Sequence, residues 1–185
     1  MRRVVGLFAI GALVFGTAGC TVPSNGITGI TIDAMGNLVV VLTWCGRQPD
    51  AVIVYHDRSS EGAAAPSEYE PSSGGSSIKD AVYVAPRIEG GIASFRLDAP
   101  DSGWEAVLKP SAFDSTITYS AYGATNDNSY STRHVRFRIG DAEELKRRPG
   151  TVLDNRYDLQ TGEESNVFVP RAEFDRQGQE ESCLE

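Results

Sequence analysis

Short runs of β-branched and aromatic residues, separated by turn residues at intervals of about ten positions, dominate the sequence. In residues 132–139, the apolar Val135, Phe137 and Ile139 alternate with polar side chains, which is typical of a strand with one buried face. Residues 38–45 are apolar at nearly every position, which indicates a strand covered on both faces. A chain built from such segments buries its apolar surface by forming sheets.

The strands that we expect share this composition and are bounded by Gly, Pro, Asn or Asp: 27–33, 38–45, 51–57, 81–85, 92–98, 104–108, 116–123, 132–139, 151–157 and 166–169. One short helix is predicted over 141–147, with Asp141 as its N-cap, Glu144 completing a capping box and Pro149-Gly150 ending it. The pattern predicts an all-β fold, an antiparallel β-sandwich of immunoglobulin-like type, with a small barrel as the alternative.

The N-terminus has the layout of an export signal. Two arginines precede an apolar run from Val4 to Gly16, which is too short for the roughly 20 residues that span a bilayer. The following Thr17-Ala18-Gly19-Cys20 resembles a bacterial lipobox, although Thr17 replaces the more usual leucine. The resemblance implies lipid attachment to the Cys20 sulfur and cleavage before Cys20. The alternative is an ordinary secretory signal that ends near a cysteine.

These features divide the chain into a lipoprotein signal peptide (1–19), a tether (20–26), a β-sandwich domain (27–175) with a long flexible loop at 58–80, and a polar C-terminal tail (176–185). A lipobox places the domain at the extracytoplasmic face of the cell membrane. Two acyl chains, such as palmitate, hold a protein there more stably than one.

The charge of the mature chain restricts its partners. Residues 20–185 contain 15 basic and 25 acidic side chains, a net charge of −10. Nucleic-acid binding depends on lysine and arginine that neutralise phosphates, so a nucleic-acid partner is not expected. Membrane contact is expected through the lipid anchor alone, and no motif indicates a cofactor.

Two cysteines remain once Cys20 carries lipid. Cys45 and Cys183 can form one disulfide, which the oxidising exterior permits. The alternative is a buried Cys45 and a separate Cys183 thiol. Two cysteines without a histidine at ligand spacing do not make a zinc site.

Candidate functional side chains are few. His56 and Asp57 are adjacent on a strand and therefore point to opposite faces, so we interpret His56 as structural. His134, Arg136 and Arg138 form an outward stripe that could contact an anion or a partner, and the alternative is a solvated face paired with acids. No catalytic or metal site is predicted.

Aromatic side chains offer a further choice of interpretation. Trp44, Trp104, Tyr55 and Tyr119 could line a groove, although aromatic residues of small sandwiches usually belong to the core.

Several stretches are similar to small lipoproteins of high-GC Gram-positive bacteria. These are Gly26-Ile27-Thr28-Gly29-Ile30, the turn 33–37, Val54-Tyr55-His56-Asp57, and 144–150 with the late Cys183. The resemblance supports the fold and the location and implies no activity. We therefore expect a non-enzymatic interaction or scaffold module that contacts an envelope protein or polymer, with a small-molecule or glycan-binding module as the alternative.

Substitution Cys20→Ser tests the lipid anchor. The variant lacks the sulfur that would carry the lipid, so we expect it to leave the membrane fraction for the soluble fraction on fractionation. Cys183→Ser is the matched control and should stay with the membranes. Continued membrane attachment of Cys20→Ser would contradict a lipid anchor at this residue.

Overall fold

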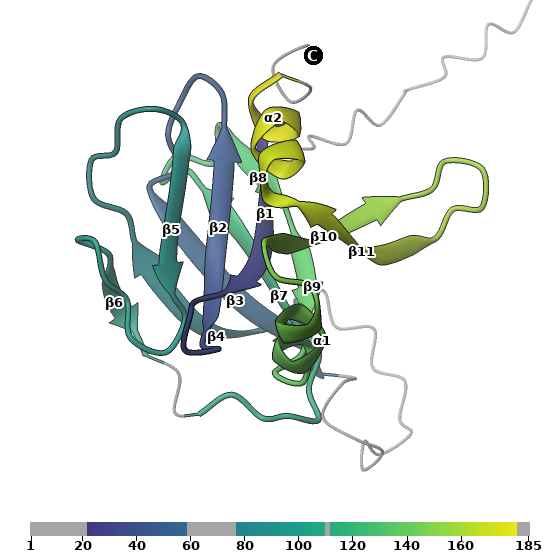
Figure 1. The fold of residues 1–185 in the computed structure, drawn as a ribbon. Helices are drawn as coiled ribbons and strands as arrows, with labels where there is room; N and C mark the ends of the chain where they lie inside the picture. Colours follow the sequence, from purple (N-terminus) through teal and green to yellow (C-terminus); the bar gives the residue numbers. More distant parts are fainter. Residues whose placement is uncertain (1–21, 59–76, 110–111, 181–185) are drawn as a thin grey trace, which may run out of the picture.

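In a computed structural model, which describes residues 22–58, 77–109 and 112–180, eleven strands join into one curled sheet of mixed direction (Figure 1). The strands are β1 (Ser24–Ile32), β2 (Leu38–Trp44), β3 (Ala51–Asp57), β4 (Ser77–Val84), β5 (Ile92–Arg96), β6 (Glu105–Leu108), β7 (Tyr119–Ala124), β8 (Ser131–Arg133), β9 (Val135–Phe137), β10 (Thr151–Tyr157) and β11 (Glu164–Pro170). Two helices accompany them, α1 (Asp141–Arg147) and α2 (Arg171–Glu180).

Strand β1 is the point at which the sheet branches. One edge pairs antiparallel with β2 from Gly26 to Ile32. The other edge is shared between two partners, because β8 pairs parallel to it at Ser24 and Ile27, and β10 pairs antiparallel to it at Ile30. The sheet therefore forks along this edge.

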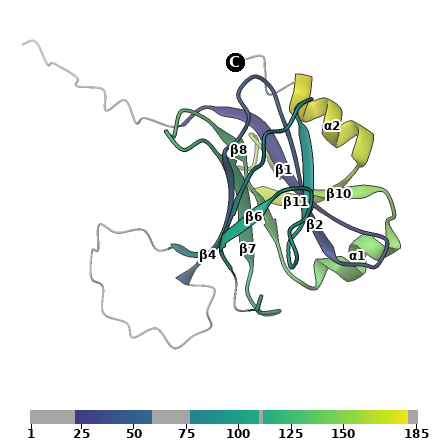
Figure 2. The ribbon, with the colours of Figure 1, turned by 90° about the vertical axis from the view of Figure 1, so that its left-hand side faces the viewer.

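The branches of the fork have different shapes. Beyond β8 the order is β7, β3, β4 and β6, and this part curls back over β2 and β5 to form a half-barrel (Figure 2). Beyond β10 there is only β11, and the two form a hairpin that stands out from the body (Figure 1). Tyr157 at the end of β10 and Leu159 in the turn that follows are exposed.

Two cores stabilise the fold. The larger core fills the half-barrel and contains, among others, Val40, Val54, Tyr83, Phe95 and Phe137. The smaller lies on the opposite side of β1 and β2, beneath α2, and consists of Ile27, Val41, Val152, Val169 and Phe174. Strands β1 and β2 thus bury both faces, as the apolar run at 38–45 predicts.

The all-β prediction is confirmed, but the immunoglobulin-like antiparallel sandwich is not, because the strands form one curled sheet of mixed direction. The pairing of β1 with β8 is parallel. Hydrophobic alternation predicts which side chains are buried and carries no information on which distant strand lies alongside, so this pairing has no local signal. The predicted strand 132–139 is also interrupted at His134, where β8 ends and β9 begins.

The predicted range of helix α1 is right, and its predicted capping box is wrong. The range 141–147 is confirmed, and Gly150, with a φ of 77°, follows the end of α1. The capping box is wrong, because Gly140 is the N-cap and the Asp141 carboxylate accepts a hydrogen bond from the Arg138 backbone N–H instead.

Helix α2 was not predicted. It extends from the predicted β-sandwich domain across residue 176 into the predicted polar C-terminal tail. Phe174 is its one large apolar side chain and is fully buried, so the segment carries no amphipathic stripe.

Several predictions fall outside the described residues. These are the signal peptide, Cys20, most of the loop at 58–80, and Cys183. Residues 77–80 of that predicted loop belong to β4. Cys45 directly follows β2, against which α2 packs, since the Thr43 hydroxyl donates to the carbonyl of Asp175. The Cys45–Cys183 disulfide stays a prediction.

Neither of the two described helices is long and apolar enough to cross a membrane.

Substitution Gly178→Ala tests the seating of α2. In an exposed helix this change stabilises by up to about 1 kcal/mol. Here the new methyl group would overlap Cγ2 of Thr43 and lie 2.9 Å from Cγ1 of Ile27. We expect a net loss of roughly 1–3 kcal/mol in the free energy of unfolding, measured by urea denaturation.

The double variant Gly178→Ala with Thr43→Ser is the control, because it removes the overlapping methyl group and should recover part of that loss. Stabilisation by Gly178→Ala alone would show that α2 is not held against β2.

Candidate binding cleft

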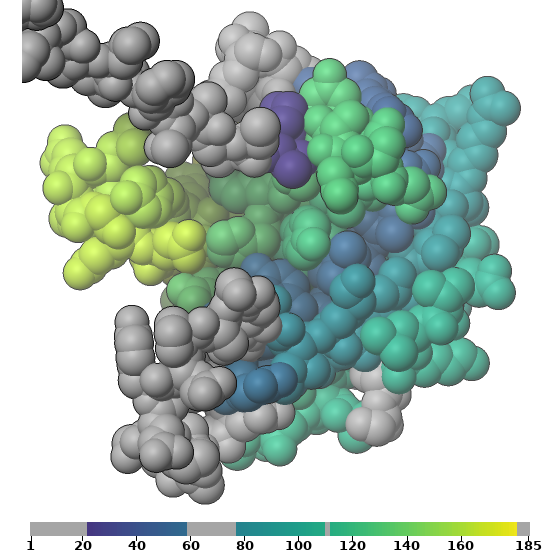
Figure 3. Space-filling model, turned by 180° about the vertical axis from the view of Figure 1, so that it is seen from behind, coloured from purple at the N-terminus to yellow at the C-terminus, as the bar shows by residue number. Residues whose placement is uncertain are grey.

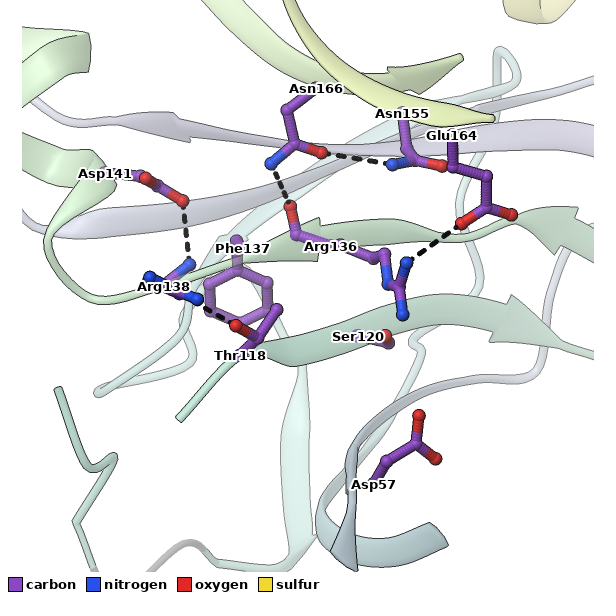
Figure 4. Close-up of a pocket in the computed structure, with 10 residues that line it drawn as sticks. All are labelled: Asp57, Thr118, Ser120, Arg136, Phe137, Arg138, Asp141, Asn155, Glu164 and Asn166. Carbon is purple, nitrogen blue, oxygen red and sulfur yellow. Dashed lines mark hydrogen bonds and ion pairs between the residues drawn. The ribbon is translucent and has the colours of Figure 1, made fainter. Parts of the chain in front are cut away.

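The fork leaves β9 with one edge that no strand of the described residues pairs with. Two side chains hydrogen-bond to the backbone along this edge, one within β9 and one at the residue that follows it (Figure 4). The Arg136 carbonyl accepts a hydrogen bond from the side-chain amide of Asn166 at 2.9 Å, and the Arg138 N–H donates to the Asp141 carboxylate at 2.7 Å. A buried backbone group without a partner is costly, so polar side chains must gather at this edge.

A cleft of about 670 Å³ lies between this edge and the β10–β11 hairpin. It extends onto the outer face of β7 and β3, and Figure 3 shows the hollow beside the protruding hairpin. The lining is mostly polar and consists of Asp57, Thr118, Ser120, Arg136, Phe137, Arg138, Asp141, Asn155, Glu164 and Asn166. The volume is in the range of ligand sites, but apolar ligands usually occupy more apolar pockets.

The predicted stripe of His134, Arg136 and Arg138 borders or lines this cleft, and each member has a protein partner. A carboxylate oxygen of Glu164 lies 3.6 Å from Nε2 of His134 and 3.3 Å from Nη1 of Arg136. Nε of Arg138 donates to the Thr118 hydroxyl at 2.8 Å. Anion contact at the stripe stays a prediction, and Glu164 competes with any anion for two of its three members.

A buried carboxylate holds the two branches of the fork together. The Asp154 side chain in β10 is 0% exposed, and both its oxygens accept hydrogen bonds from Nη2 of Arg133 in β8 at 3.0 Å. Nε of Arg156 lies 3.4 Å from the same carboxylate. Burying a carboxylate is costly unless it is paired, and the two guanidinium groups meet this requirement while remaining partly exposed.

Two tyrosines extend the site across the outer face of the sheet. Tyr55 is the direct cross-strand partner of Ser120, so both side chains lie on the outer face. The ring of Tyr122 packs edge-on against that of Tyr55, with 5.8 Å between centroids. Burial of the Tyr122 phenol, and to a smaller extent its proximity to Tyr55, raise its pKa above the usual value.

The groove interpretation of the aromatic residues is not supported for the other three. Trp44, Trp104 and Tyr119 are buried in the main core, and only Tyr55 faces outward. The preference for a core location therefore holds for three of the four aromatic residues.

His56 faces the core, on the opposite side of β3 from the cleft, as its alternation with Asp57 predicts. Its Nδ1 lies 2.8 Å from a carboxylate oxygen of Asp80, and its ring packs edge-on against Tyr119. Asp80 is the extra residue of a β-bulge in β4, which turns its side chain toward His56. Sequence reasoning missed this pair because the bulge breaks the alternation of β4.

The described part of the chain holds no group of three or more side chains that could bind a metal ion. Comparison with protein-family models, with curated proteins and with solved structures finds no match to this chain. The geometry of the cleft is therefore the feature from which a function can be inferred.

Sequence reasoning also missed Asn155, Glu164 and Asn166. They lie in a hairpin whose polar composition is typical of any exposed strand, and only the register of β10 with β11 brings Asn155 beside Asn166. The single local signal was the polar start of β11, which is compatible with many roles.

Substitution Glu164→Gln tests whether Glu164 occupies the cationic stripe. Without the carboxylate, Arg136 and His134 become available to an anion, so the salt concentration that elutes the protein from an immobilised polygalacturonate column should rise. Glu163→Gln is the matched control, because it removes the same charge from an exposed neighbour for which the structure records no ion pair. Equal elution of both variants would contradict the competition that we describe.

Proposed function

We propose that the chain is a lipid-anchored, non-enzymatic binding module of the cell envelope, and that the polar cleft is its contact surface. The observation that carries the proposal is the cleft itself, which the fork of β1 forms between β9 and the β10–β11 hairpin. The apolar side chains of the main core lie on the inner face of the half-barrel, and the cleft lies on its outside.

The polar lining favours a hydrated partner. Carboxylates, carboxamides, guanidinium groups and hydroxyls all reach the cleft, and together they supply both donors and acceptors. An envelope polymer or a polar loop of an envelope protein offers complementary groups. The scaffold role that we expect from the sequence and the glycan-binding alternative both use this surface.

Envelope retention tests the proposal. Tagged chain carrying Cys20→Ser would be mixed with washed cell envelopes of the source organism, and the sedimented fraction would be measured. We expect Arg136→Ala combined with Asn166→Ala to sediment at least about tenfold less than the parent, since both cleft walls lose polar contacts.

Arg87→Ala is the control, because Arg87 is an exposed arginine outside the cleft lining. It should sediment as the parent does. Unchanged sedimentation of the cleft variant, with a far-ultraviolet spectrum like that of the parent, would rule out the cleft as the contact surface.

A further inference from the structure

Two nearly buried residues each present to the cleft a polar atom that has no hydrogen-bond partner among the described residues. Ser120 is 8% exposed and Asn155 is 4% exposed. Among the described residues, nothing hydrogen-bonds to the Ser120 hydroxyl or to the side-chain oxygen of Asn155, and both atoms remain open to solvent. Both groups line the cleft and are therefore available to a ligand (Figure 4).

The orientation of the two carboxamides follows from their hydrogen bonds. The Arg136 carbonyl can only accept, so Asn166 presents Nδ2 to it. Asn166 Oδ1 then accepts from Nδ2 of Asn155 at 3.1 Å. These two hydrogen bonds leave Oδ1 of Asn155 as an acceptor that faces the cleft and can accept from a ligand.

The charges of the lining disfavour a strongly ionic ligand. Three carboxylates, from Asp57, Asp141 and Glu164, face two guanidinium groups. Arg136 is paired with Glu164, and Arg138 donates to Thr118. An anion would have to displace Glu164, whereas a neutral ligand with many hydroxyl groups could use the remaining donors and acceptors without separating these pairs.

The tyrosines add a surface of a different kind. A single cross-strand row on the outer face runs from Arg136 through Ser120 and Tyr55 to Lys79. Tyrosine offers a large rigid surface with a polar tip at low entropic cost, and the C–H groups of a sugar ring can pack against it.

The row is long enough for an oligomeric ligand. Neighbouring strands lie about 4.8 Å apart, so the row across β9, β7, β3 and β4 spans roughly 14 Å. A single small molecule would occupy only the end of the row at the cleft.

We infer that the cleft and this row bind a neutral oligosaccharide, with Ser120 and Asn155 bonded to its hydroxyl groups and Tyr55 packed against a sugar ring. The inference rests on the proposed function, because it identifies the ligand class of the same surface.

Saturation-transfer NMR on the full-length chain tests the inference, in a zwitterionic detergent that contains no sugar. The probes are neutral tetrasaccharides of glucose, mannose and N-acetylglucosamine, with tetragalacturonate as the anionic probe. We expect at least one neutral probe to bind with a millimolar dissociation constant, and Ser120→Ala to weaken that binding roughly three- to tenfold.

Ser94→Ala is the matched control, because Ser94 is an exposed serine of β5 outside the cleft lining. It should bind the neutral probe as the parent does. Tyr55→Ala should weaken binding by at least about tenfold while Tyr55→Phe keeps most of it, since the ring supplies the packing surface.

Three outcomes would overturn the inference. These are no binding of any neutral probe at millimolar concentration, binding of tetragalacturonate alone, and equal binding by the Ser120→Ala and Ser94→Ala variants. If any of them occurred while envelope retention still depended on the cleft, the proposed function would stand with a different ligand. If neither oligosaccharide binding nor envelope retention depended on the cleft, the cleft would not be a binding surface.

Discussion

The sharing of one edge of β1 between β8 and β10 is the constraint on which the rest of the structure depends. A strand edge has a single row of hydrogen-bonding groups, so two partners can use it only one after the other. Beyond the point where β10 replaces β8 as the partner of β1, no strand of the described residues pairs with the free edge of β9. Side chains hydrogen-bond to its backbone groups instead. The hairpin, the cleft and the polar character of the cleft all follow from this change of strand partner.

The change of partner requires a fixed register of β8 and β10 along β1, and buried polar groups fix this register. The hydroxyl of Thr28 in β1 hydrogen-bonds to that of Thr132 in β8, and Thr132 also accepts from the N–H of Gly123 in β7. Asp154 in turn requires Arg133 beside it. An apolar junction of the same size would tolerate a shift along the strands, whereas each of these groups loses its partner if β8 or β10 slips.

Local pattern predicted most of the fold and little of the site. Alternation located strands such as 132–139 and the inward direction of Val135 and Phe137, because burial on one face acts through side chains two residues apart. The parallel partner of β1 is a choice among distant strands of similar composition, so no such pattern encodes it. Helix α2 was not predicted because Phe174, its one large apolar side chain, makes no amphipathic stripe, although that side chain packs into the smaller core.

Local pattern does not encode contacts between distant strands, which explains why the sequence predicts the stripe of His134, Arg136 and Arg138 and does not predict the cleft. His134, Arg136 and Arg138 alternate within one segment, so their common face can be inferred locally. Glu164 approaches them only because the hairpin folds back beside β9. A residue whose role depends on the fork cannot be recognised before the fork is known.

The fork also orients the cleft with respect to the proposed anchor. The backbone is already hydrogen-bonded at Pro23, whose carbonyl accepts from the N–H of Ser131. If Cys20 carries lipid, the three residues from Cys20 to Val22 allow at most about 11 Å between the lipid and the folded domain. Strand β8 runs parallel to β1, so Arg136 lies further from that tethered end than the fork does. A domain held this closely would keep the start of its first strand near the headgroups, and the cleft would lie farther along the sheet from them than that start does.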